Sequence, residues 1–515
     1  GLNILVDCGM EQGNDVYENQ ELPIAASDVD CILLTHAHID HSGLIPLMYV
    51  NGFRGQVYST SATAQLCEIM LRDSAHIQMF EAEWRNRKAA RSGGKLKEFV
   101  PLYDMDAAVN VCKQFVGCEY DRVYDIAEGI KIRFTDVGHL LGSASIEVWA
   151  TEKTENGDVT EKIVFSGDIG NINKPIIKDP KHVRDADYVV MESTYGNRSH
   201  GGTPNYVEDL TDIFKRTFER GGNVVIPSFA VGRTQELLYI IRKIKEDNLV
   251  GRDFDVYMDS PLAIEATNIF IKNVESCFDD EAVELVRKGI NPLSFPGLKY
   301  ATTGDESKQI NFDPNPKVII SSSGMCEAGR IRHHLKHNLW RPECTIVFVG
   351  YQAVGTTGRI IVDGAEEIKL FGEPIQIKAE IVQLKGSSGH ADKDGLLCWI
   401  NAFDTKPKKV FVVHGEDSVC DEFTECLKEE YGYDAMAPYT GGSYDLIADR
   451  VISEGVKERK TRRTTSTQRG KTVFDRLVAA GKRLMTVITH NEGGTNKDLA
   501  KFTDQINALC DKWDR

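Results

Sequence analysis

Three histidines and one aspartate crowd into six consecutive positions, in the run HAHIDH from His36 to His41. Side chains in a tight turn point to alternate sides, so four ligands this close together can hold two divalent metals. Imidazole and carboxylate without thiolate favour zinc, manganese or iron in an open site over a closed structural zinc site. Because a metal pair can turn bound water into hydroxide at neutral pH, the run predicts metal-assisted hydrolysis.

Further polar residues lie at or just after the ends of predicted strands. In layered α/β folds these ends are where functional side chains converge, so we expect the residues to meet at one site. They are Asp7, His36, Asp168, Glu192 and His414, while His139 lies in a glycine-flanked turn. Taken singly, each also has a plainer interpretation, such as a turn residue, a cap or a buried structural histidine.

The elements that must position these residues alternate short apolar strands with helices, the α/β pattern. In the first part we predict strands over 2–6, 31–34, 56–59, 131–135, 145–150, 163–166 and 188–191, with helices over 61–90 and 104–116. A second unit with a parallel sheet is predicted from strands over 223–226, 255–258, 318–321 and 346–349, with helices between them. Strands return at 375–384 and 409–413.

Length and composition set broad limits. A chain of 515 residues is too long for one ordinary core, so two or more domains are expected. No apolar run reaches the roughly 20 residues of a membrane span, and we expect no membrane partner. Twelve scattered cysteines without a CxxC pair favour a reduced, cytoplasmic protein. The net charge of -16 disfavours a surface coated with phosphate contacts but is compatible with a nuclease that has local basic patches.

Several motifs resemble those of one known family. HAHIDH, GHLLGSAS around His139 and FSGDIG around Asp168 resemble the metal motifs of the metallo-β-lactamase fold. VVMESTYGNR around Glu192, SSGHAD around His390 and VVHGE around His414 resemble the three additional motifs of the β-CASP nucleases. The likeness covers about residues 1–440 and is closest to the bacterial and archaeal relatives of the eukaryotic pre-mRNA 3′-end cleavage endonuclease.

The resemblance implies an α/β fold, a metallo-β-lactamase αββα sandwich with an inserted β-CASP α/β domain and a helical C-terminal extension. We assign 1–196 to the first part of the sandwich, 197–372 to the cap, 373–440 to the return segment and 441–515 to a basic linker with two helices. Since the sequence opens inside a strand at Gly1, without an initiator Met, we expect the sandwich's first strands to be missing from it.

The resemblance also implies a ligand set for two divalent ions, zinc first and manganese as the alternative. One ion would be held by His36, His38 and His139, the other by Asp40, His41 and His414, with Asp168 and a hydroxide bridging both. Asp7 would orient a ligand imidazole or the HAHIDH turn. Glu192 would hold His390 as the imidazolium that protonates the leaving 3′-oxygen, which makes Asp40, Asp168, Glu192 and His390 the expected catalytic residues.

The long separation of Asp168 and His414, which would share a metal, means that a whole domain leaves the fold between them and returns. Such a domain caps the site and creates a cleft that suits a polymer. Within the cap, the run SSSG (Ser321, Ser322, Ser323 and Gly324) and the helix-start Arg233 are candidate phosphate contacts. We expect His333, His334 and His337 to lie on a solvated or RNA-facing helix face and not at a metal.

These observations predict a metal-dependent ribonuclease, acting as an endonuclease, with RNA as its partner. RNA is preferred over DNA because the DNA-cleaving branch of the family usually has valine where this chain has His414. Three alternatives are a 5′→3′ exoribonuclease mode, a hydrolase of a small ester or thioester on the same fold, and a silent RNA-processing scaffold. Apolar stripes in the two C-terminal helices are expected to pack on the protein's own body or on a second copy in a homodimer.

Overall fold

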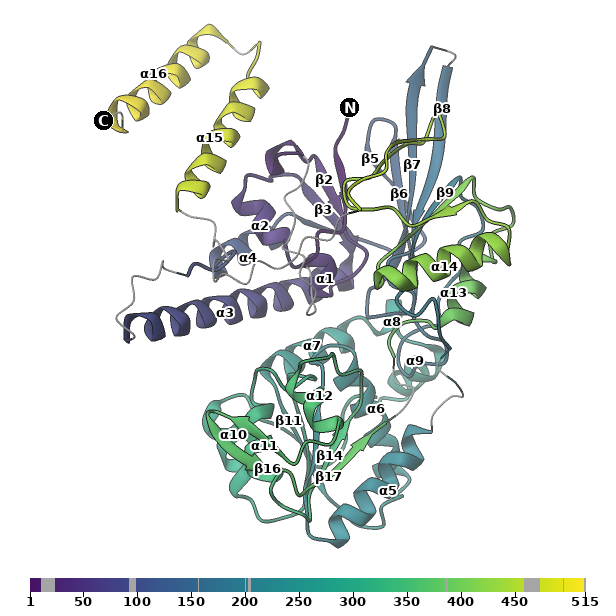
Figure 1. Cartoon of the computed structure of the whole chain (residues 1–515), viewed down its shortest axis with the longest axis vertical. Helices are drawn as coiled ribbons and strands as arrows, with labels where there is room; N and C mark the ends of the chain where they lie inside the picture. The colour runs from purple at the N-terminus through teal and green to yellow at the C-terminus, as the bar shows by residue number, and fades with distance from the viewer. Residues whose placement is uncertain are drawn as a thin grey trace.

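The chain is described by a computed structural model at residues 1–10, 24–91, 99–155, 157–199, 201, 205–384, 388–457, 473–493 and 495–513. Figure 1 shows two α/β bodies, one above the other, and a pair of C-terminal helices that stand apart from both. The predicted linker lies almost wholly outside the described residues. Among the described residues, no helix combines the length and the apolar character needed to cross a bilayer.

The upper body contains two β-sheets. The smaller is parallel, with the order β1-β2-β3-β4: β1 (Ile4–Val6), β2 (Cys31–Leu33), β3 (Gln56–Thr60) and β4 (Phe115–Cys118). The larger has the order β19-β18-β9-β8-β7-β6-β5: β5 (Val123–Ala127), β6 (Ile130–Asp136), β7 (Ala144–Thr154), β8 (Gly157–Phe165), β9 (Tyr188–Glu192), β18 (Lys409–Val413) and β19 (Ala435–Met436). Strand β18 pairs with β9 in parallel, so the chain returns to this sheet after its long excursion.

Apolar side chains hold the upper body together in four layers. The two sheets face each other through buried residues such as Leu33, Phe134 and Ile146. On the outer face of the small sheet lie α1 (Ile39–Ser42), α2 (Ile45–Val50), α3 (Ser61–Arg91) and α4 (Met105–Cys112). On the outer face of the large sheet lie α13 (Lys393–Ile400) and α14 (Asp417–Glu429), through Trp399 and Leu427. The predicted αββα sandwich is thereby confirmed.

The lower body is built on a parallel six-stranded sheet with the order β12-β11-β13-β10-β14-β17. Its strands are β10 (Val224–Pro227), β11 (Asp255–Asp259), β12 (Leu298–Tyr300), β13 (Lys317–Ser321), β14 (Thr345–Phe348) and β17 (Glu380–Gln383). Its helices are α5 (Tyr206–Glu219), α6 (Arg233–Glu246), α7 (Pro261–Lys272), α8 (Val274–Cys277), α9 (Asp280–Arg287), α10 (Gly304–Phe312), α11 (Ile331–Asn338) and α12 (Thr357–Val362). This is the α/β insertion predicted for the middle of the chain.

Two predicted elements differ from those observed. The helix predicted over 104–116 ends at Cys112, because the next short apolar run pairs with β3 and becomes β4. The strand predicted over 375–384 is two strands: β16 (Glu373–Gln376) forms a hairpin with β15 (Glu367–Leu370), whereas β17 completes the cap sheet. Strand β17 thus still belongs to the cap sheet, while the domain bounds given above stay a prediction.

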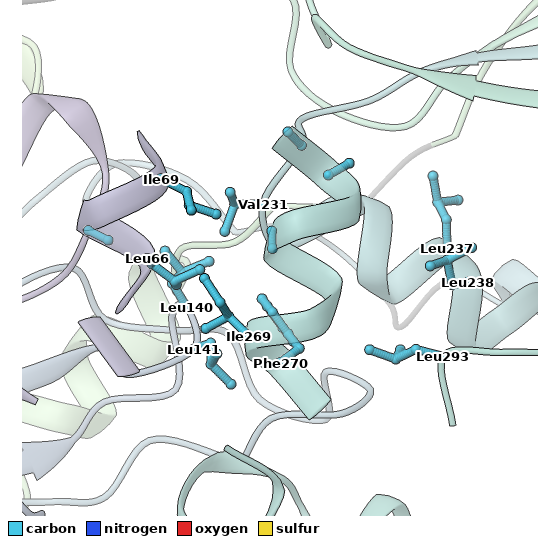
Figure 2. Close-up of a cluster of buried hydrophobic side chains, with 14 of the residues drawn as sticks. Leu66, Ile69, Leu140, Leu141, Val231, Leu237, Leu238, Ile269, Phe270 and Leu293 are labelled. Atoms are coloured by element: carbon cyan, nitrogen blue, oxygen red, sulfur yellow. The ribbon is translucent and has the colours of Figure 1, made fainter. Parts of the chain in front are cut away.

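The two bodies share one hydrophobic core. In Figure 2, Leu66 and Ile69 of α3 face Val231 from the loop that follows β10, and Ile269 and Phe270 of α7 lie beside the Leu140–Leu141 turn. All of these side chains are buried. Burying apolar surface on both sides of a junction disfavours separation of the two bodies, so the cap is fixed over the turn that carries His139.

The C-terminal helices α15 (Val473–His490) and α16 (Asn496–Trp513) make little contact with the body. The hydroxyls of Thr486 and Ser27 lie 3.1 Å apart, next to the short 3-10 helix Ala26–Asp28. Helix α16 buries none of its side chains. A small antiparallel sheet, β20 (Ser443–Asp445) with β21 (Arg450–Ser453), precedes the two helices.

Candidate metal centre

The HAHIDH run forms the turn between β2 and the short helix α1. His38 sits at the N-cap of α1, so the side chains of the turn diverge into two groups. In the first group, His36 Nε2 and His139 Nε2 lie 3.0 and 3.1 Å from His38 Nδ1. Asp168 Oδ2 lies 3.5 Å from His36 Nε2. Four donor atoms thus converge within 4.8 Å of one another.

The second group lies on the other side of Asp168. It consists of Asp40, His41 and His414, again with donor atoms within 4.8 Å of one another. His41 Nε2 lies 3.0 Å from His414 Nε2, and His414 Nε2 lies 3.7 Å from Asp40 Oδ2. Asp168 Oδ1 lies 3.2 Å from His41 Nε2, so the two oxygens of this carboxylate face the two groups.

The imidazoles are held so that one nitrogen of each faces its group. Nδ1 of His41 donates to Asp7 Oδ2 at 2.7 Å, and Nδ1 of His139 lies 3.3 Å from the carbonyl oxygen of Gly389. Nδ1 of His414 lies 3.2 Å from the hydroxyl of Thr194. Because Nδ1 of each of these rings is fixed by a neighbour, Nε2 of the same ring is directed into its group of donor atoms. Metal-ligating histidines are usually oriented in this way.

Asp7 organises the turn as well as His41. Its two carboxylate oxygens accept from the backbone N–H and the hydroxyl of Thr35, both at 2.8 Å. Asp7 and His414 each follow a strand in the left-handed region, with φ of 56° and 52°. Aspartate and histidine tolerate this conformation better than most residues. Gly9 lets the loop after β1 lie directly against the backbone of the HAHIDH turn, because a Cβ on Gly9 would lie 1.4 Å from Asp40 O.

Burial keeps the first group neutral. It lowers the pKa of His36 and His139 well below the ordinary value and that of His38 to about 4. Neutral imidazoles offer lone pairs, and these lone pairs point at one another. Asp168 Oδ1 is buried and accepts no hydrogen bond within the part of the chain that the structure describes. A converging set of nitrogen lone pairs around an unsatisfied carboxylate oxygen fits divalent metal ions.

The second group has the opposite electrostatic character. Burial opposes protonation of His41, yet the carboxylates of Asp168 and Asp7 hold its pKa well above the ordinary value. Burial likewise opposes protonation of His414, but Asp168 and Asp40 raise its pKa to about 9. The carboxylates of Asp168, Asp7 and Asp40 thus create a negative potential around these two imidazoles, and this potential favours a bound cation.

Glu192 and His390 form a pair beside the first group. His390 Nδ1 lies 3.3 and 3.2 Å from the two carboxylate oxygens of Glu192. Glu192 is buried and also accepts from the backbone N–H of Ile169 at 2.5 Å. Burial disfavours the imidazolium, but Glu192 and then Asp168 raise the pKa of His390 above its ordinary value. The pair can therefore hold a proton next to the metal-binding residues.

A buried ion-pair chain that the sequence did not indicate joins the centre to the cap. The Lys174 ammonium donates to the carbonyl oxygen of His139 at 3.0 Å and lies 3.2 Å from Glu236 in the first turn of α6. Glu236 also pairs with Arg233. Arg233 does begin α6, as predicted, but its guanidinium is engaged by a carboxylate of its own helix. Lysine and glutamate carry no motif signal, so only the fold reveals this chain.

The serine run of the cap is only partly placed as predicted. Ser321 is buried and its hydroxyl donates to Asp259 O at 2.8 Å, so it is not available to a phosphate. Ser322 and Ser323 are half-buried in the loop that follows β13, and Gly324 is buried.

His334 is also buried, with Nε2 2.6 Å from Asp259 Oδ2. The expectation of a solvated face is therefore wrong for His334, because a buried carboxylate draws it inward.

Three domain families match the chain in order. A metallo-beta-lactamase superfamily domain matches residues 1–171, and a beta-Casp domain matches residues 234–361. A Zn-dependent metallo-hydrolase RNA specificity domain matches residues 374–438. Together these matches cover the strands and turns that carry the two groups of metal-binding residues.

Curated relatives match over most of this chain. A ribonuclease of Thermus thermophilus is 34% identical over 418 residues, which are 81% of this chain and 88% of that protein. The transcription termination factor FttA of Methanosarcina mazei is 32% identical, over 84% of this chain but only 66% of its own length. An RNase J-like protein of Methanocaldococcus jannaschii is 31% identical, over 80% of this chain and 87% of its own length.

Proposed function

Because this chain belongs to the β-CASP family of metallo-β-lactamase-fold hydrolases, we propose that it is a metal-dependent ribonuclease that cleaves RNA endonucleolytically. The observation that carries the proposal is the convergence of two groups of donor atoms on the two oxygens of Asp168. The neighbouring Glu192–His390 pair supplies a protonated group at the same place. A hydrolase of phosphodiesters needs both parts.

Two metal ions are proposed for the centre, zinc first and manganese as the alternative. His36, His38 and His139 would hold one ion, Asp40, His41 and His414 the other, with Asp168 between them. When bound, such ions supply an activated water and neutralise charge that develops on the phosphate. Asp7 would keep His41 and the HAHIDH turn in place for them.

His390 is the proposed general acid. Its pKa is raised by the Glu192 carboxylate, so at neutral pH a larger share of the imidazole carries the proton. Donation of that proton to the leaving 3′-oxygen would yield a 3′-hydroxyl and a 5′-phosphate. General acids contribute about 10²- to 10⁴-fold to rates. We expect His390→Ala to lose activity on RNA in that range, and to lose much less on an activated aryl phosphodiester whose leaving group needs no proton.

RNA is favoured as substrate by the match to an RNA specificity domain over residues 374–438 and by the relatives named as ribonucleases. The second candidate is a 5′→3′ exonuclease mode, favoured by the likeness to an RNase J-like protein.

We also propose a cytoplasmic location, because all twelve cysteines are free thiols in the structure. A homodimer formed through the C-terminal helices is the proposed assembly.

Circular single-stranded RNA distinguishes the two modes, since it has no end from which an exonuclease can begin. Wild-type protein with Zn²⁺ or Mn²⁺ is expected to linearise the circle, whereas matched circular DNA stays intact. Cleavage of linear 5′-phosphorylated RNA with no cleavage of the circle would replace the endonuclease proposal by the exonuclease one. Turnover of a small ester without cleavage of either RNA would contradict both.

A further inference from the structure

The carboxyl ends of the cap strands form an ordered row. Strands β13, β10, β14 and β17 are parallel neighbours in this order. The chain leaves β10 towards β11 on one side of the sheet and leaves β14 towards β17 on the other. Neighbouring strands whose connections diverge in this way create a crevice outside their carboxyl ends, where ligands of open α/β sheets bind.

Two exposed aromatic side chains border this crevice. Phe229 follows β10 and is 44% exposed, and Tyr351 follows β14 and is 52% exposed. The Phe229 ring rests on the glycine of the serine run, since a Cβ on Gly324 would lie 3.0 Å from its Cδ2. Gly350, the residue before Tyr351, also lies beside the Phe229 ring. A Cβ on Gly350 would be 3.9 Å from Phe229 Cε2, which is an ordinary contact distance. Two large aromatic side chains are thus open to solvent at neighbouring strand ends.

The same row of strand ends leads to the metal centre. Three residues after Phe229, Gly232 lies against Leu140, where an added Cβ would be 3.1 Å from Leu140 Cδ1. Leu140 is next to the ligand His139. On the other side of Tyr351, β17 leads to the segment that carries His390, and Leu384 donates its N–H to Phe348 O of β14. In the order of the strand ends, the aromatic pair therefore comes between the half-buried serines that follow β13, Ser322 and Ser323, and the end of β17.

We propose that Phe229 and Tyr351 form a base-stacking subsite for nucleotides of single-stranded RNA that flank the scissile phosphate, an inference that rests on the proposed ribonuclease function. Stacking on aromatic rings suits every base and needs no sequence readout. It also suits an acidic protein, because it adds affinity without extra positive charge.

The test measures binding and cleavage of a 5′-labelled oligoadenylate by Phe229→Ala and Tyr351→Ala. Each variant is expected to weaken RNA binding about tenfold, in the lower part of the range for loss of one stacked base. Phe229→Trp and Tyr351→Phe should bind like wild type. Hydrolysis of bis-p-nitrophenyl phosphate, which has no base, should stay unchanged in all four variants.

Two controls separate stacking from a structural role. Trp340 is 54% exposed and lies between α11 and the start of β14, away from the carboxyl ends of the strands, so Trp340→Ala should leave RNA binding unchanged. An oligoadenylate with a single abasic position placed over the subsite should bind wild type and Phe229→Ala equally.

Tenfold losses that persist with every abasic RNA would overturn stacking, as would unchanged binding by both alanine variants. Wild type that neither binds nor cleaves RNA would overturn the ribonuclease proposal itself.

Discussion

At the scale of single residues, the centre depends on groups that never need to touch a substrate. Asp7 receives three hydrogen bonds, from Thr35 twice and from His41, and it sits in a left-handed conformation to do so. Its carboxylate fixes which nitrogen of His41 faces Asp168. The sequence indicated that Asp7 lies at a strand end, but these three contacts are visible only in the fold.

Asp7→Asn tests this positioning role. The asparagine amide oxygen can still accept a hydrogen bond from Thr35. It no longer holds Nδ1 of His41 by a charge-assisted bond, so Nε2 of His41 loses its fixed direction. We expect a loss of about 10- to 100-fold in metal affinity or in RNA cleavage, the range found for groups that orient metal-ligating histidines. Zinc content after dialysis and cleavage rate are the measurements. Asp30→Asn, at an exposed carboxylate near the same sheet, should change neither.

Asp136 gives a pH-dependent prediction. Burial raises its pKa from 3.8 to about 7, and its carboxylate accepts from Gly138 N at 3.0 Å. An acid whose pKa is raised by folding holds its proton more tightly in the folded state. Its contribution is therefore favourable below about pH 4 and is lost as the pH rises to about 7, at a cost of about 4 kcal/mol.

Asp136→Asn removes that titration and keeps the acceptor for Gly138 N. The variant should melt several degrees higher than wild type at pH 8, and the difference should shrink as the pH falls towards 5. Thermal unfolding of both proteins across this pH range measures it. A constant difference in Tm over the range would contradict the raised pKa.

At the scale of elements, the strands that carry ligands were predictable and their neighbours in space were not. The ends of β2, β9 and β18 followed from short apolar runs next to His36, Glu192 and His414. The sheet to which β17 belongs could not be inferred, because an apolar strand fits either body. Nor could the burial of His334, since its partner Asp259 lies far away in the sequence and shows no motif.

The Lys174–Glu236 pair tests the connection between the elements that carry the centre and those of the cap. Removing Lys174 leaves the buried Glu236 carboxylate with Arg233 as its remaining partner, so the cost should fall below the range of about 3–5 kcal/mol that is typical when a buried pair loses one partner. Lys174→Met should still lower Tm in the metal-free protein and also weaken zinc retention, because His139 O loses its donor. The matched control is Lys181→Met, whose pair with Asp121 is about half exposed and should contribute less than about 1 kcal/mol.

At the scale of the whole molecule, the C-terminal helices stand out because much of their apolar surface is not covered by the rest of the chain. Leu477, Leu509 and Trp513 are 66%, 55% and 64% exposed, although each belongs to an apolar stripe. Helix α16 begins with a side-chain cap, since Asp498 N donates to Thr495 Oγ1 at 3.3 Å. A well-formed helix with an uncovered stripe is what a dimer interface looks like in a single subunit.

Shortening the chain after residue 456 tests the dimer. We expect the full chain to have the mass of two subunits by light scattering at micromolar concentration, and the shortened chain that of one. The shortened chain should still cleave RNA, because every proposed metal-binding residue precedes the cut. Leu509→Glu in the full chain should give the same change in mass without a deletion. A monomeric full chain would contradict the proposed assembly.

The most direct test of the account is a metal titration of RNA cleavage. Metal-free protein and its Asp168→Ala variant are given increasing Zn²⁺, and the rate of cleavage of 5′-labelled single-stranded RNA is measured at each metal-to-protein ratio. We expect cleavage by wild type to be absent without metal, to rise until about two ions are bound per chain, and to stay absent in Asp168→Ala. Cleavage by the metal-free protein, or undiminished cleavage by Asp168→Ala, would contradict a centre built around the two oxygens of this carboxylate.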